Sequence, residues 1–345
     1  MNLLDIREIL EELCGRAAPS GFEAPAAEAA RKLLEPLVDE VSVDRMGSLL
    51  GVRRCGVPGA KKLLLDAHLD EIGLMVTGAE EGFLRFRAIG GVDSRMLPDR
   101  EVLILADPPI PGVVVCQPPH LQAAGDQDKS IPISDLWIDA GLTQARAEAL
   151  IGTPMVYREG CAPLGKDQVC GKALDDRSCF AVLLRALELL REKPLDVDLY
   201  VMGSTREEVS GVGATVGAWS VAPDCCVAVD VTHGRTPDAP ADKTFPLGEG
   251  PAVGIGPNMT RWMTRRLLDK AAAREIPVQR EIMAGHTGTN GWEMQISREG
   301  VATAVLSLPL KYMHTPVEVV SLADLEQTAR LLAAFVEDLG KEWPL

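Results

Sequence analysis

The feature that most constrains the fold is an alternation of apolar, strand-like runs with amphipathic, helix-like stretches from residue 173 onward. The expected helices are 176–192, 211–220, 259–274 and 321–338, and the expected strands are 197–203, 225–231, 277–283 and 301–308. Alternating strands and helices form largely parallel sheets that helices cover on both faces. The sequence therefore predicts an α/β fold built on a mostly parallel mixed sheet with helices on both faces.

The pattern is different between residues 72 and 164. Short runs such as "IGLMVTG", "FLRFRAIGG" and "GVVVCQPP" are cut by Gly and Pro, which is typical of a small all-β unit. Helices at 3–13 and 24–35 and an apolar strand at 63–67 are expected before this stretch. We therefore expect a discontinuous α/β domain of residues 1–71 and 165–345, with residues 72–164 inserted as a β-rich domain.

The composition argues against several classes of protein. The 345 residues carry a formal net charge of −15, and no run of Lys and Arg is longer than a pair. A nucleic-acid partner is not expected, because nucleic acids are bound through phosphate neutralisation. No run reaches the roughly 18 apolar residues of a membrane span, and the first residues lack the features of a signal peptide. The eight cysteines form no CxxC pair, so we expect reduced thiols and a cytoplasmic protein without a membrane partner.

Polar side chains that can bind metals follow four of the predicted strands. His68 ends the run "LLLDA", the pair Glu207 and Glu208 follows "VDLYVMGST", Asp230 ends "CCVAV", and His314 follows "ATAVLSLPLKYM". The carboxyl ends of parallel strands lie at one edge of an open α/β sheet, which is where ligands bind. We therefore expect these side chains to lie close together.

Asp175 and Asp176 open the expected helix 176–192 and are a fifth candidate. Taken singly, each candidate has a simpler interpretation. The aspartate pair can cap the helix, the glutamate pair can be a solvated loop, and a lone histidine can be a hydrogen-bonded residue at a sheet edge. Their shared placement favours a single site, because unrelated loop residues would be scattered over both edges of the sheet.

Two histidines, two aspartates and a glutamate pair suit Zn²⁺ and other divalent first-row metals. One carboxylate that bridges two ions, with one His and one acidic residue on each ion, gives a dinuclear hydrolytic site that activates water and polarises a carbonyl. The remaining glutamate can then act as a general base. Asp70 points to the same strand face as His68 and can orient its imidazole.

The motifs "APSGFE", "AHLDEIG", "GKALDDRS", "REEVSGVGA", "AVDVTH" and "SREGVATAVLSLPLKYMHTPVEVV" occur in this order. Over nearly its whole length the chain resembles the tetrahedral (TET) co-catalytic metallo-aminopeptidases, which include glutamyl and deblocking aminopeptidases. The resemblance implies a zinc-peptidase-like catalytic domain that removes the N-terminal residue from short peptides with a free N-terminus. It also implies two divalent metal ions per subunit, with zinc expected and cobalt or manganese as alternatives.

The resemblance also implies roles for individual residues. It assigns His68 and Asp230 to one metal ion, Glu208 and His314 to the other, Asp175 as the bridge, Glu207 as the catalytic base and Asp70 as the carboxylate that orients His68. The inserted domain would be a β-barrel or PDZ-like domain that helps to build a homo-dodecamer.

The chain departs from the family pattern at several positions. Arg206 and Ser210 stand where Gln and Gly are frequent, and Asn290 stands in "GHTGTNGW" where Asp is common. His286, in the same segment, is either a pocket residue or a surface-loop residue. These changes spare the expected metal ligands and leave the first-residue preference open.

Other functions compete with an aminopeptidase. The stretch "GVGATVG", with Asp230 after it, resembles a dinucleotide-binding motif. However, the spacing is GxGxxxG, and Glu207 and Glu208 would repel the pyrophosphate. A carboxypeptidase, an N-deacylase or a carbohydrate hydrolase could use the same dinuclear site. A non-catalytic metal-binding shell protein is a further alternative, although a purely structural site would not need Glu207 as a spare base.

Overall fold

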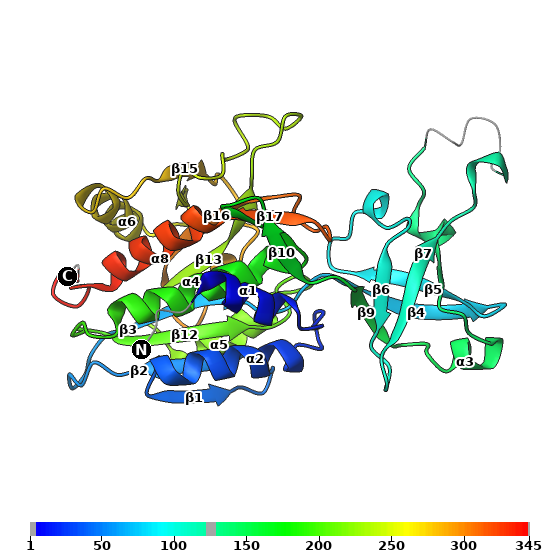
Figure 1. The fold of residues 1–345 in the computed structure, drawn as a ribbon. Coiled ribbons are helices and arrows are strands. Elements are labelled where there is room, and N and C mark those ends of the chain that lie inside the picture. Colours follow the sequence, from blue (N-terminus) through cyan, green and yellow to red (C-terminus); the bar gives the residue numbers. More distant parts are fainter. Residues whose placement is uncertain (1–4, 122–128, 344–345) are drawn as a thin grey trace.

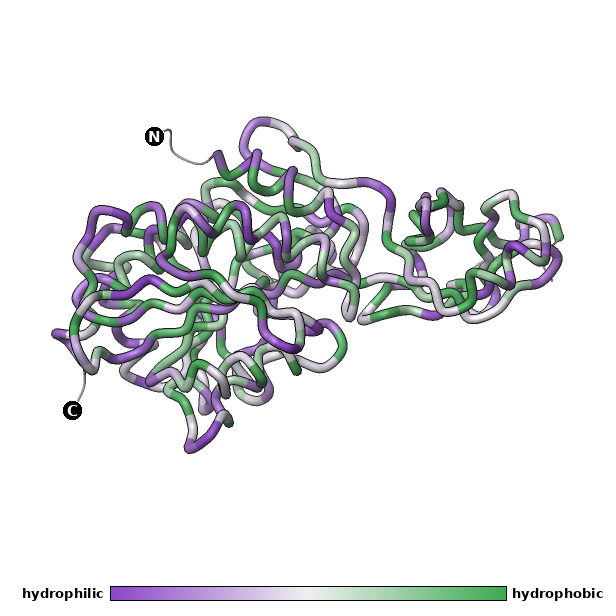
Figure 2. Tube along the Cα trace, turned by 90° about the horizontal axis from the view of Figure 1, so that it is seen from below, coloured by the Kyte–Doolittle hydropathy of each residue, from purple (hydrophilic) through white to green (hydrophobic). Residues whose placement is uncertain are grey.

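The computed structural model describes residues 5–121 and 129–343, which form two lobes (Figure 1). The larger lobe contains a mixed sheet of eleven strands, and the smaller lobe is a closed six-stranded barrel. The barrel stands beside the larger lobe, as the view from below also shows (Figure 2). The predicted α/β fold with an inserted small β-barrel is therefore confirmed.

The main path of the large sheet has the order β1-β2-β12-β3-β13-β16-β17-β11-β10. In this order the strands are β1 (Glu40–Val43), β2 (Leu49–Arg53), β12 (Asp198–Ser204), β3 (Lys62–His68), β13 (Cys225–His233), β16 (Ala302–Lys311), β17 (Glu318–Ser321), β11 (Gln168–Gly171) and β10 (Cys161–Leu164). Off this path, β14 (Ala252–Ile255) pairs with β16 and with β15 (Gln279–Ile282). The central strands β12, β3, β13 and β16 run parallel, whereas β2 and β17 flank them antiparallel. The sheet is thus parallel at its centre and antiparallel towards its edges.

Helices cover both faces of the sheet, as the sequence predicts. The helices are α1 (Ile6–Cys14), α2 (Ala24–Leu34), α3 (Gln144–Glu148), α4 (Leu174–Leu190), α5 (Val212–Val221), α6 (Arg261–Ala273), α7 (Gly291–Met294) and α8 (Leu322–Val336), with short 3-10 turns η1 (Glu35–Leu37), η2 (Ser94–Met96), η3 (Pro119–Leu121) and η4 (Ile133–Asp135). Leu63 and Leu65 of β3 pack in one apolar cluster with α1, α2, α4 and α8, and Leu64 packs in another with α5 and α7. Successive side chains of a strand point to opposite faces, so the apolar run of β3 serves both layers. None of these helices is long and apolar enough to cross a membrane.

The barrel has its own hydrophobic core. Its strands, in order around the barrel, are β4 (Gly73–Glu80), β5 (Phe83–Ile89), β8 (Trp137–Asp139), β7 (Ile110–Val115), β6 (Glu101–Ile104) and β9 (Pro154–Tyr157). Alternate residues such as Leu84, Phe86 and Val102 are buried inside it. β10 lies within the range expected for the insertion, but it pairs with β11 in the large sheet. The barrel strands therefore begin at Gly73 and end at Tyr157.

Candidate active site

The parallel strands bring the predicted residues to one edge of the large sheet. His68 is the last residue of β3, and Glu207 and Glu208 lie in the turn after β12. Asp230 lies inside β13, which continues to His233 because Val231 to His233 pair with β16. The strand is thus longer than the expected 225–231, although the aspartate still lies near its carboxyl end.

Asp175 lies between the two histidines. Its Oδ1 is 3.1 Å from His68 Nε2, and its Oδ2 is 3.5 Å from His314 Nε2. The carboxylate is buried and presents one oxygen to each imidazole. This is the arrangement expected of a carboxylate that bridges two cations. Its pKa falls below the ordinary range, because the two histidines outweigh the effect of burial.

Two groups of side chains at this edge could hold a metal ion. His68, Asp175 and Glu208 form one group, and in each group the ligand atoms lie within 4.8 Å of one another. Glu208 Oε2 is also 3.2 Å from His314 Nε2. The fold therefore brings His68, Asp175, Glu208 and His314 close together, as the sequence predicted.

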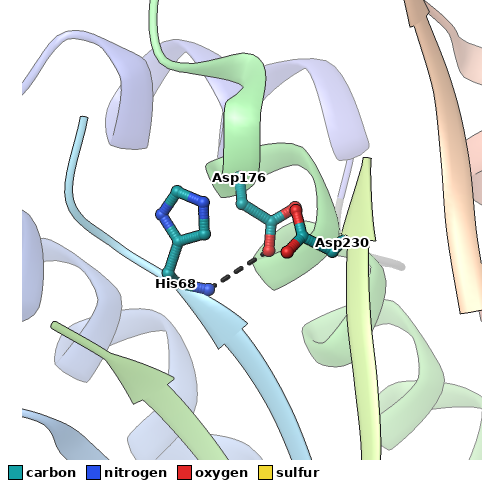
Figure 3. A group of neighbouring side chains, drawn as sticks. All are labelled: His68, Asp176 and Asp230. Atoms are coloured by element: carbon teal, nitrogen blue, oxygen red, sulfur yellow. Dashed lines mark hydrogen bonds between the residues drawn. The ribbon is translucent and has the colours of Figure 1, made fainter. Parts of the chain in front are cut away.

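His68, Asp176 and Asp230 form the second group (Figure 3). Figure 3 shows the carboxylates of Asp176 and Asp230 side by side, and the backbone N–H of His68 donates a hydrogen bond to Asp176 Oδ2 at 3.1 Å. Burial raises the pKa of both carboxyls well above the ordinary range, and nearby carboxylates raise it further. The sequence placed Asp176 beside Asp175 as a candidate, with a helix cap as the simpler interpretation, and the resemblance gave Asp176 no role. Its backbone contact with His68 depends on tertiary structure, for which the sequence carries no signal.

The donor set fits divalent metal ions. Buried carboxylates converge with two imidazoles, and within residues 5–121 and 129–343 no Lys or Arg side chain forms an ion pair with Asp175, Glu208 or Asp230. Burial tends to lower the pKa of His68, but the hydrogen bonds that its ring donates to the carboxylates of Asp175 and Asp70 outweigh burial, so that pKa is raised. The described part of the chain thus gathers carboxylates here without a Lys or Arg paired to these three.

Glu207 stands beside this group with a partly open carboxylate. Its Oε2 lies 3.9 Å from His68 Nε2, and its side chain is 18% exposed. Burial raises the pKa of Glu207 to about 7, and the negative charges of Asp175 and Asp70 add to the increase. A carboxylate with a pKa near neutrality can both take up and release a proton at physiological pH.

Asp70 holds the turn that carries the two glutamates. Its Oδ1 accepts a hydrogen bond from the backbone N–H of Glu207 at 3.1 Å, and its Oδ2 accepts one from that of Glu208 at 3.2 Å. The Ser20 hydroxyl also donates to Oδ2, at 2.5 Å. His68 Nδ1 lies 3.2 Å from the backbone oxygen of Asp70 and 3.4 Å from Asp70 Oδ1. Asp70 therefore braces both His68 and the glutamate turn.

Glu23 braces the same turn from the N-terminal segment. Its Oε1 accepts hydrogen bonds from the backbone N–H groups of Gly21 at 2.6 Å and Arg206 at 3.1 Å. Together with the two bonds to Asp70, three successive N–H groups of residues 206–208 are bound by buried carboxylates. The motif "APSGFE" thus supports the site, a role that the sequence alone did not suggest.

The barrel reaches the site through Gly91, two residues beyond β5. The carbonyl oxygen of Gly91 lies 3.0 Å from His314 Nδ1. A Cβ atom on Gly91 would lie 2.7 Å from the same nitrogen, so only glycine fits without displacing the ring. The His314 imidazole is therefore oriented by the inserted lobe.

The segment "GHTGTNGW" is anchored by Asn290. Its Nδ2 donates hydrogen bonds to Asp66 Oδ2 at 2.8 Å and to Ser204 Oγ at 2.9 Å, and the residue is buried. His286 is exposed and stacks on Trp292, with 4.3 Å between the ring centroids. Asn290 therefore attaches the segment to the sheet, and His286 lies on its outer side.

The glycines of "GVGATVG" are explained by packing. A Cβ atom on Gly213 would lie 2.3 Å from the backbone oxygen of Thr205, and one on Gly217 would lie 2.1 Å from the sulfur of Met202. These glycines allow α5 to approach β12 closely. The glycine pattern therefore needs no nucleotide to account for it.

Comparisons with known proteins place the chain in a family. Residues 47–331 match the family described as M42 glutamyl aminopeptidase. The chain belongs to the M42 family. M42 peptidases are metallopeptidases, and the carboxylate and histidine groups found here are consistent with that.

Individual relatives are similar over almost the whole chain. A lysyl aminopeptidase of Pyrococcus furiosus is 33% identical over 96% of this chain and 97% of its own length. The solved aminopeptidase from the archaeon Desulfurococcus kamchatkensis has a TM-score of 0.89 at 33% identity, covering 96% of this chain and 94% of that one. The TET1 peptidase of Pyrococcus horikoshii has a TM-score of 0.85 at 29% identity, covering 97% of this chain and 100% of that one. The resemblance to TET aminopeptidases is therefore confirmed.

Proposed function

We propose that this chain is a dinuclear metallo-aminopeptidase that releases the N-terminal residue of short peptides with a free N-terminus. The observation that carries the proposal is the position of Asp175, whose two oxygens face two different imidazoles. Membership of the M42 family supports peptide hydrolysis. The named aminopeptidase relatives support an action at the N-terminus.

Four of the five proposed ligands belong to the two groups of side chains, and His314 joins them through its contacts with Asp175 and Glu208. His68 and Asp230 would hold one ion, Glu208 and His314 the other, and Asp175 would bridge them. When bound, such ions polarise a carbonyl group and lower the pKa of water. Zinc suits these nitrogen and oxygen ligands, as do cobalt and manganese. Asp176 holds the backbone of His68 and needs no place in the ligand set.

Glu207 would act as the general base. Its carboxylate is beside His68, has no hydrogen-bond donor among the described side chains, and is partly open. It would take a proton from the attacking water and deliver it to the amine that leaves. Asp70 would keep this carboxylate in place through the backbone of the 207–208 turn.

The proposal is tested by the hydrolysis of aminoacyl-anilides, each paired with its N-acetylated form, after loading with Zn²⁺ or Co²⁺. We expect cleavage only of the compounds with a free amine, and the panel would also reveal the first-residue preference. Cleavage of the acetylated forms would instead indicate an N-deacylase. Cleavage of C-terminally blocked and free dipeptides should be compared as well, because dependence on a free carboxylate would indicate a carboxypeptidase. No cleavage by metal-loaded protein would favour a non-catalytic shell protein.

We further propose that the chain assembles into a homo-dodecamer. The TET1 peptidase of Pyrococcus horikoshii is described as assembling into a tetrahedron or a large octahedral shell, and this chain covers its full length. Light scattering on the purified protein should give about twelve times the 37.0 kDa chain mass. A monomeric or dimeric mass would contradict the assembly and leave the proposed chemistry untouched.

A further inference from the structure

Glu318 begins β17, and the proposed mechanism gives it no role. The residue is only 2% exposed, although a glutamate is almost never fully buried without a partner. Its Oε2 accepts a hydrogen bond from the backbone N–H of Asp175 at 3.1 Å, and its Oε1 accepts one from that of His314 at 3.0 Å. One carboxylate therefore joins two distant segments of the chain, each of which carries a proposed metal ligand.

The backbones of Asp175 and His314 do not have the dihedral angles of a regular helix or strand, so the hydrogen bonds of regular secondary structure do not fix them. His314 lies beyond the end of β16 with a φ of +62°, in the left-handed region that residues other than glycine rarely adopt. Asp175 has a φ of −78° and a ψ of 106°, which are not helical. Ala173, two residues before it, has a φ of +58°. Such conformations persist where surrounding contacts hold them. Hydrogen bonds to a carboxylate suit this task, because they are about twice as strong as neutral ones.

We propose that Glu318 is a positioning residue that sets the separation between Asp175 and His314. Asp175 Oδ2 lies 3.5 Å from His314 Nε2, and the main chains of both residues are attached to the same carboxylate. The contact of His314 Nδ1 with Gly91 orients the ring, whereas the bond to Glu318 fixes the backbone from which the ring extends. The inference rests on the proposed dinuclear site and concerns the ion held by Glu208 and His314.

Glu318→Gln is the variant that tests this role. Glutamine keeps the size of the side chain but offers one carbonyl oxygen and one NH₂ group, so one of the two backbone N–H groups would face a donor. We expect the affinity for one of the two ions to fall at least tenfold, while the other changes less. The measurement is equilibrium dialysis against buffered Zn²⁺, with the bound metal quantified by mass spectrometry. It requires no substrate.

Asp324 provides a matched control outside the site. It is buried, and its Oδ2 and Oδ1 accept hydrogen bonds from the backbone N–H groups of Gly248 at 2.7 Å and Gly250 at 2.8 Å. Asp324→Asn therefore replaces a carboxylate of the same kind by an amide in the same way. We expect both variants to lower the thermal unfolding midpoint of the metal-free protein, and only Glu318→Gln to weaken Zn²⁺ binding.

Wild-type affinities for both ions in folded Glu318→Gln would overturn the proposal. An equal loss of affinity in Asp324→Asn would also overturn it, because the loss would then follow from general destabilisation. If Glu318→Gln does not fold, Glu318→Asp is measured in the same way, since it keeps both oxygens on a shorter side chain. We expect Glu318→Asp also to lower the affinity for one of the two ions, and unchanged Zn²⁺ binding would overturn the proposal. Failure of the proposed function is distinguishable, because wild-type protein would then bind two ions and cleave no peptide analogue.

Discussion

Glu71 and Lys172 form a buried ion pair just beyond the end of β3, with 2.7 Å between Glu71 Oε2 and Lys172 Nζ. Glu71 Oε1 also lies 3.1 Å from Nη2 of Arg177, which is fully buried. Arg177 donates further hydrogen bonds to the backbone oxygens of Leu69 and Leu13. The cluster therefore ties the end of β3 to the start of α4 and to the N-terminal segment.

The loss of Glu71 should destabilise the protein more than the loss of its partner Lys172. Glu71→Gln removes the carboxylate that both buried cations share, so we expect a loss of about 3–5 kcal/mol in the free energy of unfolding. Lys172→Met leaves Glu71 paired with Arg177, and we expect a clearly smaller loss. Denaturant unfolding of the metal-free proteins at pH 7 measures both. Equal losses would show that the carboxylate is not the centre of the cluster.

Glu207→Gln tests the proposed base. The amide keeps the size of the side chain but cannot accept the proton of water, so we expect kcat to fall by about 10²- to 10⁴-fold. Both metal ions should remain bound, because Glu207 is not among the proposed ligands. Turnover of the best anilide and the metal content of the same sample should be measured together. Near-normal turnover would remove Glu207 from the mechanism.

His314→Ala tests the proposed ligand set. The variant loses an imidazole that faces both Asp175 and Glu208, so we expect at least one metal ion per chain to be lost on dialysis. His286→Ala is the control, because that imidazole is exposed and stacks on Trp292. If His314→Ala retains both ions, the residue is not a ligand.

The stability of the metal-free protein should depend on Glu207 between about pH 4.5 and 7. Burial raises its pKa from the ordinary 4.5 to about 7, so the folded state binds this proton more tightly than the unfolded state. The stabilisation is complete below pH 4.5 and is lost as the pH rises through 7, with a magnitude of up to about 3 kcal/mol. Glu207→Gln should therefore show a flatter pH dependence of the unfolding free energy, measured in the presence of a chelator. Parallel curves for the two proteins would contradict the raised pKa.

The sequence predicted the centre of the fold better than its margins. The runs that became β3, β12, β13 and β16 are apolar and long, because strands buried on both faces need apolar residues throughout. The short strands β10, β11, β14 and β17 were not predicted as separate strands. Each has four residues. β11, β14 and β17 pair with strands distant in sequence, which no local pattern reveals, and β10 pairs with the neighbouring β11.

Some residues of the candidate site could likewise be predicted from the sequence, and others could not. His68, Glu207, Glu208 and His314 could be predicted because they are polar residues at the ends of apolar strands. Glu23 and Glu318 could not, because their importance lies in the distant backbone N–H groups that they bind. Asp176 was a candidate, but its hydrogen bond from the backbone of His68 could not be predicted. One local signal did exist for Glu318, since a single acid stands among the β-branched residues of "PVEVV". This pattern predicts that the Glu318 carboxylate is buried, but it does not identify the backbone N–H groups that bind it.

The contact between Gly91 and His314 limits how far the two lobes can be treated as separate modules. The small lobe has its own core and closed barrel, which would suggest that it can be deleted or exchanged for another domain. Yet its backbone carbonyl is what holds one imidazole of the site in its orientation. A shortened chain in which a linker replaces the barrel strands from Gly73 to Tyr157 would keep the large sheet and remove the carbonyl group that contacts this ring. An engineered replacement for the barrel would have to supply a carbonyl group at the same point in space.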